Sequence, residues 1–467
     1  MKFTIAKCVW GQAYVATMLG YNLPSLLAPG NLLRLAAGHE IEHILYTTAA
    51  DAAVIRRSPT FQRLAGLVPS MIVEIEADEM LDGVGYGAII DRMNAVHNRI
   101  LRHCWEQGRI WLFDQPDHVW ADGSLGTLAE RAASGQDCIV FPAVRTVKER
   151  VEPALDRLRV ADGSIVVDSR CLVGIALDNL HTHDCARIWG PKTATVWPHH
   201  VSWRVGPGAM VRRAFYTQPF AVRPPTAWVS AERSVDMHYL DRAFPDPERI
   251  HFIDDTDDFF VLEVSTQFHV LDANPQPLSI GLLSAWAASA TGTYQRACFH
   301  RPVRFHSAAV PERCWRRMEA FSERIAQALD DAVALRNTAD TIESRRPWLT
   351  LLVHRFLGLL DQRPVGPWRG SDFIVLVPPE AELEDTALST ADGDLWQVAT
   401  SHIVSGRYDP ETCTAGWEAV TLSGRRLTAE AEGNGLRIAG RAVTGVIRVS
   451  ERLCLLELGP FGPSEQG

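Results

Sequence analysis

The spacing of apolar and polar residues over the first 145 positions predicts strands and helices in alternation. Apolar residues recur at helical spacing from Ile89 to Cys104, which predicts a long amphipathic helix. Short apolar runs predict buried strands at Phe3–Val9, Ile41–Thr48, Met71–Ile75, Ile110–Phe113 and Cys138–Val144. Strands that alternate with helices in this way predict an α/β, Rossmann-like fold with a mostly parallel sheet covered on both faces.

The pattern becomes less regular after this region. Helices are predicted at Glu152–Leu158 and Val167–Leu180, and aromatic-rich strands follow from Ala209 to Val222. Two further strands, Ile250–Ile253 and Phe259–Val264, flank an acidic run. These segments extend the first domain to about residue 300.

The last third of the chain changes in character. Helices are predicted between residues 311 and 362, first in WRRMEAFSERIAQALDDAVAL and then in WLTLLVHRFLGLLDQ. Short strands and glycine turns follow Pro364. The chain is therefore predicted to contain a domain at residues 1–300, a helical connector at 301–341 and a second domain at 342–463.

Composition restricts the class of protein. The chain has 467 residues, of which 46% are hydrophobic and 22% charged, as in a globular protein with more than one domain. A net charge of −10 argues against nucleic-acid binding. The nine scattered cysteines lack a CxxC pair and predict reduced thiols, and no apolar stretch reaches the ~20 residues of a membrane span. We expect a cytoplasmic protein without a signal peptide.

An acidic loop follows the strand that begins at Ile110. The segment Trp111–Ser124 (WLFDQPDHVWADGS) carries Asp114, Asp117 and Asp122. Parallel strands bind ligands beyond their carboxyl ends, and carboxylates there suit a hard divalent cation. The alternative is an ordinary loop whose polar residues make a turn and cap a helix. Asp117 is the first candidate for the cation, whereas Asp122 fits the turn before a helix capped by Ser124.

Several motifs accompany this order of elements. They are Trp10-Gly11, SLLAPGNL, Tyr46-Thr47-Thr48 before Asp51, FDQPDHVWADGSL, WPHHVSWRVG, and SVDMHYLDRAFPD followed by IDDTDD. Together they resemble the nucleotide-diphospho-sugar transferase, or GT-A, fold of bacterial glycosyltransferases, over roughly residues 1 to 300. The resemblance implies sugar transfer from a nucleotide-diphospho-sugar to a glycan, protein or small-molecule acceptor, with Mn²⁺ or Mg²⁺.

The resemblance also assigns residues. Its metal-binding Asp-x-Asp falls on Asp117 with Asp114 in support, although the spacing here is Asp-x-x-Asp. His199 is a further candidate metal ligand or pyrophosphate contact. The residues implied in donor binding are Trp10, Gly11, Thr47, Thr48, Asp51, Trp203 and Arg204.

Acidic and histidine side chains are candidates for proton transfer. An inverting reaction needs a base, for which Asp236, Asp257 and Asp258 are the candidates. The alternatives are a turn at Asp236 and an exposed acidic loop from Asp254 to Asp258. The motif His181-x-His183-Asp184 leaves a metal-dependent hydrolase as another hypothesis.

The C-terminal region has its own resemblance. DFIVLVPPEAEL, ATSHIVSGRYDPETCTAG and the strand-rich segment from VTLSGRRL to LLELGPF resemble a fasciclin-like α+β domain over residues 342–463. Such a domain implies a possible protein partner. A non-catalytic scaffold built on a degenerate transferase fold is therefore the alternative to an enzyme.

Overall fold

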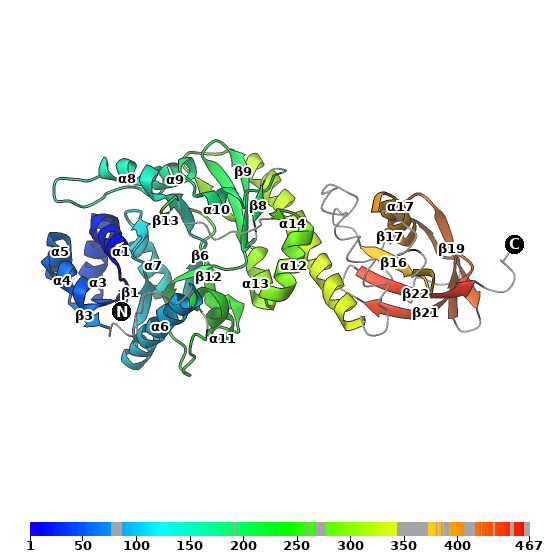
Figure 1. Cartoon of the computed structure of the whole chain (residues 1–467), viewed down its shortest axis with the longest axis horizontal. Coiled ribbons are helices and arrows are strands. Elements are labelled where there is room, and N and C mark those ends of the chain that lie inside the picture. Colours follow the sequence, from blue (N-terminus) through cyan, green and yellow to red (C-terminus); the bar gives the residue numbers. More distant parts are fainter. Residues whose placement is uncertain are drawn as a thin grey trace. The chain divides into compact units, whose positions relative to one another are not determined.

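The computed structural model divides the chain into two units, which Figure 1 shows by element. The first unit comprises Met1–Pro275 and Thr293–Glu319, and the second Gln276–Gly292 and Ala320–Gly467. The structure describes residues 1–75, 86–190, 193–195, 197–232, 234–257, 259–267, 276–342, 372–379, 381–383, 386, 392–405, 416–421, 423–432, 435–448 and 453–461.

A seven-stranded sheet forms the centre of the first unit. Its order is β12-β6-β11-β4-β1-β2-β3. β1, β2, β3 and β4 pair in parallel and so do β6 and β12, whereas β11 runs antiparallel to its neighbours β4 and β6. The strands are β1 (Lys2–Cys8), β2 (Glu40–Thr47), β3 (Ser70–Glu74), β4 (Ile110–Phe113), β6 (Cys138–Phe141), β11 (Gln218–Val222) and β12 (Ile250–Phe252). The predicted α/β class is therefore confirmed, with a mixed sheet.

Helices cover both faces of this sheet because each strand sends alternate side chains to opposite sides. Phe3 and Ile5 of β1 belong to one apolar cluster, and Ala6 and Cys8 belong to another on the other face. The second cluster includes α6 and α11, which Figure 1 shows near one another. The helices of the first cluster include α1 (Gln12–Thr17), α2 (Leu23–Leu26), α3 (Arg34–Gly38), α4 (Ala49–Arg57), α5 (Pro59–Leu67) and α7 (Ser124–Ala133). Those of the second include α6 (Tyr86–Gln107), η4 (Val235–Tyr239) and α11 (Leu240–Ala243).

Two local predictions differ from the structure. The sequence predicts a helix over SLLAPGNLLRLAAG that ends at Gly38, but the structure breaks it, because Pro29 forces the preceding Ala28 into extended backbone. η1 (Met18–Asn22) and α2 (Leu23–Leu26) precede the break, and η2 (Pro29–Leu33) and α3 (Arg34–Gly38) follow it. The helix cap expected at Ser124 is instead Gly123, with φ 96°, and the Ser124 hydroxyl donates to the carbonyl of Phe260 at 3.2 Å.

Smaller sheets flank the main one. One has the order β5-β13-β7 and the other β15-β10-β9. The strand predicted at Cys138–Val144 is split, since β6 ends before Pro142 and β7 begins after it. The remaining elements of this unit are β5 (His118–Trp120), β7 (Val144–Val147), α8 (Lys148–Asp156), α9 (Ser169–Asp178), α10 (Thr182–Cys185), β8 (Ala194–Thr195), β9 (His200–Gly206), β10 (Ala209–Ala214), η5 (Pro247–Arg249), β13 (Val261–Ser265), α13 (Thr293–Phe299) and β15 (Val303–His306).

The second unit is rich in strands. Its sheet has the order β17-β16-β22-β21-β20-β19-β18, and a bridge between Val404 and Thr421 brings the two ends of the sheet together. The helix predicted at WLTLLVHRFLGLLDQ lies outside the described residues. The elements are β14 (Gln276–Pro277), α12 (Ile280–Ala290), the later part of α14 (Glu312–Ile342), β16 (Phe373–Val377), α17 (Asp392–His402), β17 (Ile403–Ser405), β18 (Glu418–Val420), β19 (Arg426–Glu432), β20 (Gly435–Ile438), β21 (Arg441–Arg448) and β22 (Leu453–Phe461).

Two general expectations can be compared with the described residues. None of the described helices combines the length and apolarity that crossing a bilayer requires. Every described cysteine has a free thiol. Both observations agree with the sequence-based expectations on membrane spans and disulfides.

A buried histidine in β2 is expected to make the fold sensitive to acid. His43 is 1% exposed, and neither ring nitrogen has a hydrogen-bond partner. Burial, helped by the Lys7 charge, lowers the pKa of His43 from 6.5 to about 3. The unfolded chain binds a proton there below about pH 6.5 and the folded chain does not, so stability is full above that pH and falls as the pH drops toward 3.

We predict that His43→Phe makes unfolding less dependent on pH. At pH 5 the native histidine lowers the free energy of unfolding by roughly 2 kcal/mol relative to pH 7.5, and phenylalanine removes this contribution. Urea unfolding at both pH values measures the difference. Phe61→Leu, at a ring neighbour of His43 6.3 Å away, is the control for packing and should keep the native pH dependence. An unchanged pH dependence in His43→Phe would contradict the prediction.

Candidate functional site

The order of the main sheet places a topological switch point between two of its strands. β1 is followed in space by β2 and β3 on one side, whereas β4 lies on its other side. At such a switch point the loops that follow two neighbouring strands diverge, and α/β proteins bind ligands in the resulting crevice. Trp10 and Gly11 follow β1, and Asp114 and Asp117 follow β4. Residues that were predicted from the sequence to belong to the site therefore border this switch point.

Hydrogen bonds join the loops after β1 and β2. Asp51 Oδ2 accepts from the Gly11 backbone N–H and from the Thr48 hydroxyl, each at 2.9 Å. Thr48 caps α4 by accepting from the Asp51 N–H at 3.2 Å. Gly11 has φ 83°, a conformation that glycine adopts readily. Trp10 is half-buried and Thr47 buried beside them, so the predicted donor-binding residues of the first two strands lie together.

Asp114, in the loop after β4, belongs to a buried polar network. Lys7 of β1 forms an ion pair with its carboxylate, and both side chains are 0% exposed. Asn22 Nδ2 and Trp120 Nε1 donate to Asp114 Oδ1 at 2.9 and 2.8 Å. Burial would raise the pKa of Asp114, but the Lys7 charge and the His118 hydrogen bond outweigh burial and lower it. The Lys7 ammonium already neutralises the carboxylate that was predicted to support a metal ion.

Asp117 lies in a different environment. Its backbone carbonyl accepts from Val264 N–H at 2.9 Å, which places the half-buried Asp117 beside β13. Burial and the nearby Glu263 carboxylate raise the pKa of Asp117 to about 6. Arg145 Nη2 in turn pairs with Glu263 Oε1 at 2.5 Å. Two carboxylates and one guanidinium therefore meet beside the switch point, a group that can bind a cation or exchange a proton.

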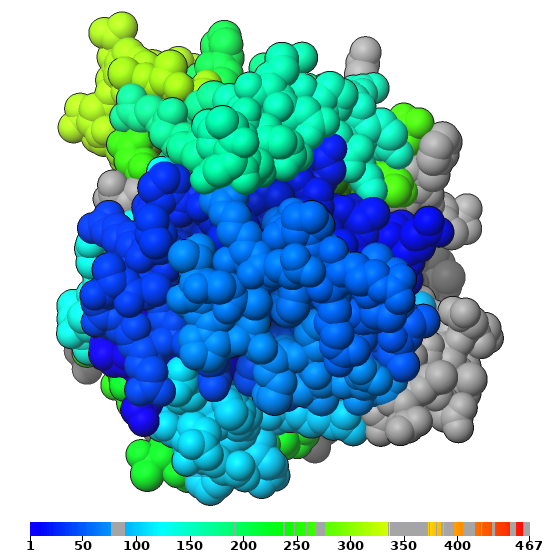
Figure 2. All heavy atoms as spheres, turned by 90° about the vertical axis from the view of Figure 1, so that its left-hand side faces the viewer, coloured from blue at the N-terminus to red at the C-terminus, as the bar shows by residue number. Residues whose placement is uncertain are grey.

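A lysine adjoins the N-terminal helices near this group. Lys148, the first residue of α8, donates to the Thr17 hydroxyl at 2.8 Å. Arg159 donates to the Gly20 carbonyl at 3.0 Å. In Figure 2 the teal spheres around residues 150–165 lie against the dark blue N-terminal residues. Lys148, which also lies 3.5 Å from Glu152, thus places one positive charge beside α1.

The predicted residues around β9 form a second group, of which His199 lies near enough to Arg145 to be affected by its charge. Burial, and then the Arg187 charge, lower the pKa of His199 well below its usual value, so this histidine is neutral. Trp203 is 2% exposed and stacks on Trp189 with ring centroids 6.1 Å apart, whereas Arg204 is exposed. Among the described residues, His199 does not share a three-ligand group with Asp114 and Asp117.

The histidines of the hydrolase hypothesis are held by other contacts. His181 Nε2 is 3.0 Å from the Thr266 carbonyl, and His181 Nδ1 accepts from the His183 N–H at 3.3 Å. Asp184 forms an ion pair with Arg212, and its Oδ1 lies 3.2 Å from His200 Nε2. Burial would raise the pKa of Asp184, but Arg212 outweighs burial and lowers it. Asp184 thus stabilises a buried polar network.

The candidate bases lie apart from the switch-point residues. Asp236 is half-buried in η4, on the α6 face of the sheet, and accepts a hydrogen bond from the Ser234 hydroxyl. Asp257 lies beyond the end of β12 and pairs with Arg170 of α9, with Nε at 2.7 Å from Oδ1. Asp258 lies outside the described residues.

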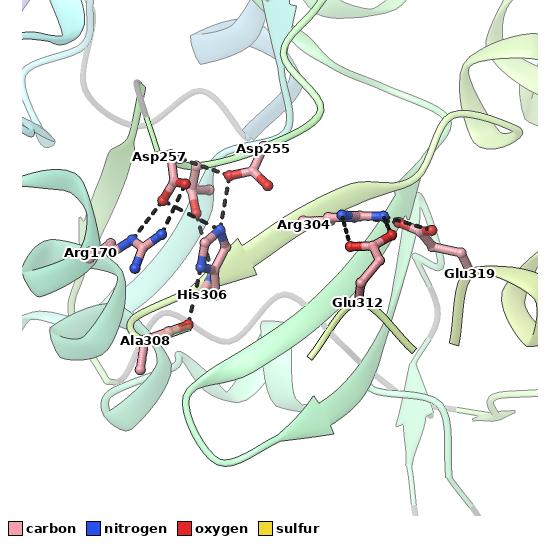
Figure 3. Close-up of polar contacts among 9 residues, drawn as sticks. Arg170, Asp255, Asp257, Arg304, His306, Ala308, Glu312 and Glu319 are labelled. Carbon is pink, nitrogen blue, oxygen red and sulfur yellow. Dashed lines mark hydrogen bonds and ion pairs between the residues drawn. The ribbon is translucent and has the colours of Figure 1, made fainter. Parts of the chain in front are cut away.

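Asp257 also belongs to a group that the sequence did not predict. Asp255, Asp257 and His306 place one ligand atom each within 4.8 Å of one another, the arrangement that Figure 3 draws. Asp255 and Asp257 have the Asp-x-Asp spacing that FDQPDH lacks, and this was an available signal. No sequence signal pointed to His306 or Arg170, because both lie far from Asp255 and Asp257 in the sequence.

Comparison with known proteins identifies no relative whose site could be compared with this geometry. The residues and contacts of the chain itself therefore carry the functional argument. No protein-family model matches the chain, and no curated protein matches it.

Proposed function

We propose that the first unit is a glycosyltransferase that uses a nucleotide-diphospho-sugar and a divalent cation. The observation that carries the proposal is the switch point between β1 and β4, with the Gly11–Asp51 contact after β1 and Asp117 after β4. Parallel strands followed by an acidic loop after β4 suit the GT-A arrangement, and we include that fold in the proposal.

Asp117 and Glu263 are the residues that would hold the cation. Burial and repulsion from the Glu263 carboxylate raise the cost of ionising Asp117, as its raised pKa reflects. A divalent cation between them would remove that repulsion, and Mn²⁺ or Mg²⁺ commonly uses one or two carboxylates together with phosphate oxygens and water. Bound there, the ion would stabilise the negative charge of the leaving nucleoside diphosphate.

Positive side chains near the switch point would assist with the diphosphate. Arg145 lies in β7 and Lys148 directly follows it, and both side chains are partly exposed, at 27% and 21%. Fixed cations near a developing negative charge lower the barrier to transfer because they need no reorganisation during the reaction. Gly11 and Asp51 would position the nucleoside, since their contact fixes the loops after β1 and β2.

Nucleotide-sugar binding tests the proposal directly. We expect one or more UDP- or GDP-sugars to bind the full chain in the presence of MnCl₂, measured by isothermal titration calorimetry, and to release nucleoside diphosphate slowly. EDTA should weaken the binding. Asp51→Ala should weaken it by about 10-fold, because the acceptor for the Gly11 N–H and Thr48 hydroxyl is lost, which is worth about 1 to 2 kcal/mol.

Asp91→Ala is the matched control, since Asp91 is an exposed carboxylate on α6. This variant should bind the nucleotide sugar as the native chain does. Equal weakening in both variants would argue for a general charge effect. If no nucleotide sugar binds with either Mn²⁺ or Mg²⁺, the transferase proposal is lost and the scaffold alternative is favoured.

A further inference from the structure

Two segments of the first unit meet at a group of metal-ligating side chains. Asp255 and Asp257 lie in the loop after β12, and His306 is the last residue of β15. His306 Nε2 is 2.9 Å from Asp255 Oδ1 and 3.5 Å from Asp257 Oδ1. Figure 3 shows both carboxylates directed toward the imidazole ring. Two oxygen donors and one nitrogen donor thus converge on one point.

The orientation of the histidine ring identifies the group as more than an acidic loop. His306 is 7% exposed, and its Nδ1 lies 3.2 Å from the Ala308 carbonyl, to which it donates. A neutral ring then has its lone pair on Nε2, facing carboxylate oxygens that are acceptors themselves. A positive centre must therefore lie between them, either a proton or a cation. Metal-bound histidines commonly donate their second N–H to a carbonyl in this way.

We propose that Asp255, Asp257 and His306 bind one divalent transition-metal ion, Zn²⁺ or Mn²⁺. The imidazole nitrogen favours these ions over Mg²⁺ and Ca²⁺, which prefer oxygen ligands. The Asp255 and Asp257 side chains are 37% and 45% exposed, so the remaining coordination positions face solvent. Three protein ligands with an open side is the pattern of metal centres that retain water.

The backbone around the group holds its two halves in register. Thr256 N–H donates to the Arg304 carbonyl at 3.1 Å, and His306 N–H to the Thr256 hydroxyl at 3.3 Å. Arg304 is fixed by Glu319 and Glu312, at 2.6 and 3.1 Å. Figure 3 shows this ion-pair network beside the three ligands. The ligands therefore come from segments that hydrogen bonds already keep together.

Arg170 is the cation that now neutralises Asp257. Its Nε and Nη2 donate to the two carboxylate oxygens at 2.7 and 3.0 Å. The Arg170 side chain is 44% exposed, so it can move into solvent when an ion takes its place. The centre is distinct from the Asp117 group, because β11 and β6 separate β12 from β4 in the sheet. The inference does not depend on sugar transfer.

Metal titration of the full chain tests this centre. An Asp117→Asn chain, freed of metal with EDTA and dialysed, removes the contribution of the other proposed ion. We expect it to bind one Zn²⁺ or Mn²⁺ per chain by isothermal titration calorimetry, at least about 10-fold more tightly than Mg²⁺. Adding Asp257→Asn or His306→Gln should each lower the affinity by at least about 10-fold.

Glu312→Gln is the matched control, since it removes a neighbouring carboxylate that is 56% exposed and not a ligand. Its affinity should equal that of the Asp117→Asn chain. Circular dichroism of each variant verifies folding, and Asp255→Asn provides a third variant if His306→Gln does not fold. A chain that binds no Zn²⁺ or Mn²⁺, or whose ligand variants bind as well as Glu312→Gln, overturns the proposal and leaves His306 with a proton.

Discussion

Replacing Lys7 with methionine is expected to lower the free energy of unfolding of the first unit by about 3 to 5 kcal/mol. Lys7 and Asp114 are both fully buried, and their ion pair joins β1 to the loop after β4. Methionine fills much of the same space but leaves the Asp114 carboxylate without its counter-charge. Hydrogen bonds from Asn22 and Trp120 remain, yet they do not neutralise a buried charge.

Urea unfolding followed by tryptophan fluorescence measures the effect. Lys2→Met is the matched control, because Lys2 is 54% exposed and 3.8 Å from Glu40, and it should cost less than about 1 kcal/mol. The double variant Lys7→Met with Asp114→Asn should cost less than the two single variants added together, since it leaves no unpaired charge. A loss below 1 kcal/mol in Lys7→Met would show that the pair is not ionised.

Replacing Asp117 with asparagine is expected to reduce sugar transfer by about 10²- to 10³-fold, the usual range for losing one stabiliser of transition-state charge. The amide keeps the shape of the side chain but cannot supply the negative charge that a divalent ion needs. Folding should be preserved, because Asp117 is only half-buried. The unfavourable proximity to Glu263 also disappears, so thermal stability should be equal or higher.

Release of nucleoside diphosphate at saturating Mn²⁺ is the measurement for this variant. Glu130→Gln serves as the control, since Glu130 is 67% exposed and pairs with Arg34 on the surface. Glu263→Gln should also reduce transfer, because Glu263 is the second proposed ligand. If Asp117→Asn turns over as fast as the native chain, Asp117 has no role in the reaction, even if nucleotide sugars still bind.

Elements whose causes are local could be predicted from the sequence. The strand at Ile110–Phe113 has the bounds of β4, and the helix pattern from Ile89 to Cys104 falls within α6. The insertion of β11 between β4 and β6 could not be predicted, because pairing between distant strands leaves no periodic signal. The cap at Gly123 escaped prediction because Ser124 turns its hydroxyl to Phe260, a contact that only the folded chain defines.

The candidate site likewise contains some residues that the local sequence predicts and others that depend on distant parts of the chain. Gly11, Thr48 and Asp51 could be placed together because they follow parallel strands that end at one edge. The different environments of Asp114 and Asp117 could not be predicted, because they depend on Lys7 in β1 and on Glu263 in β13. The predicted division at residue 300 placed β15 in the connector, but β15 pairs with β10 in the first unit.

β15 pairs with β10 of the first unit, although residues 276–292 of the second unit precede it in the sequence. This order affects how the protein folds during synthesis. β10 lies between β9 and β15, so its second edge is covered only when residues 303–306 have been synthesised. Until then a nascent chain on the ribosome exposes an unpaired strand edge, which is prone to aggregate. A truncation at residue 275 would keep that edge open permanently. The first unit can therefore complete its folding only after residues 276–292, which belong to the second unit, have left the ribosome.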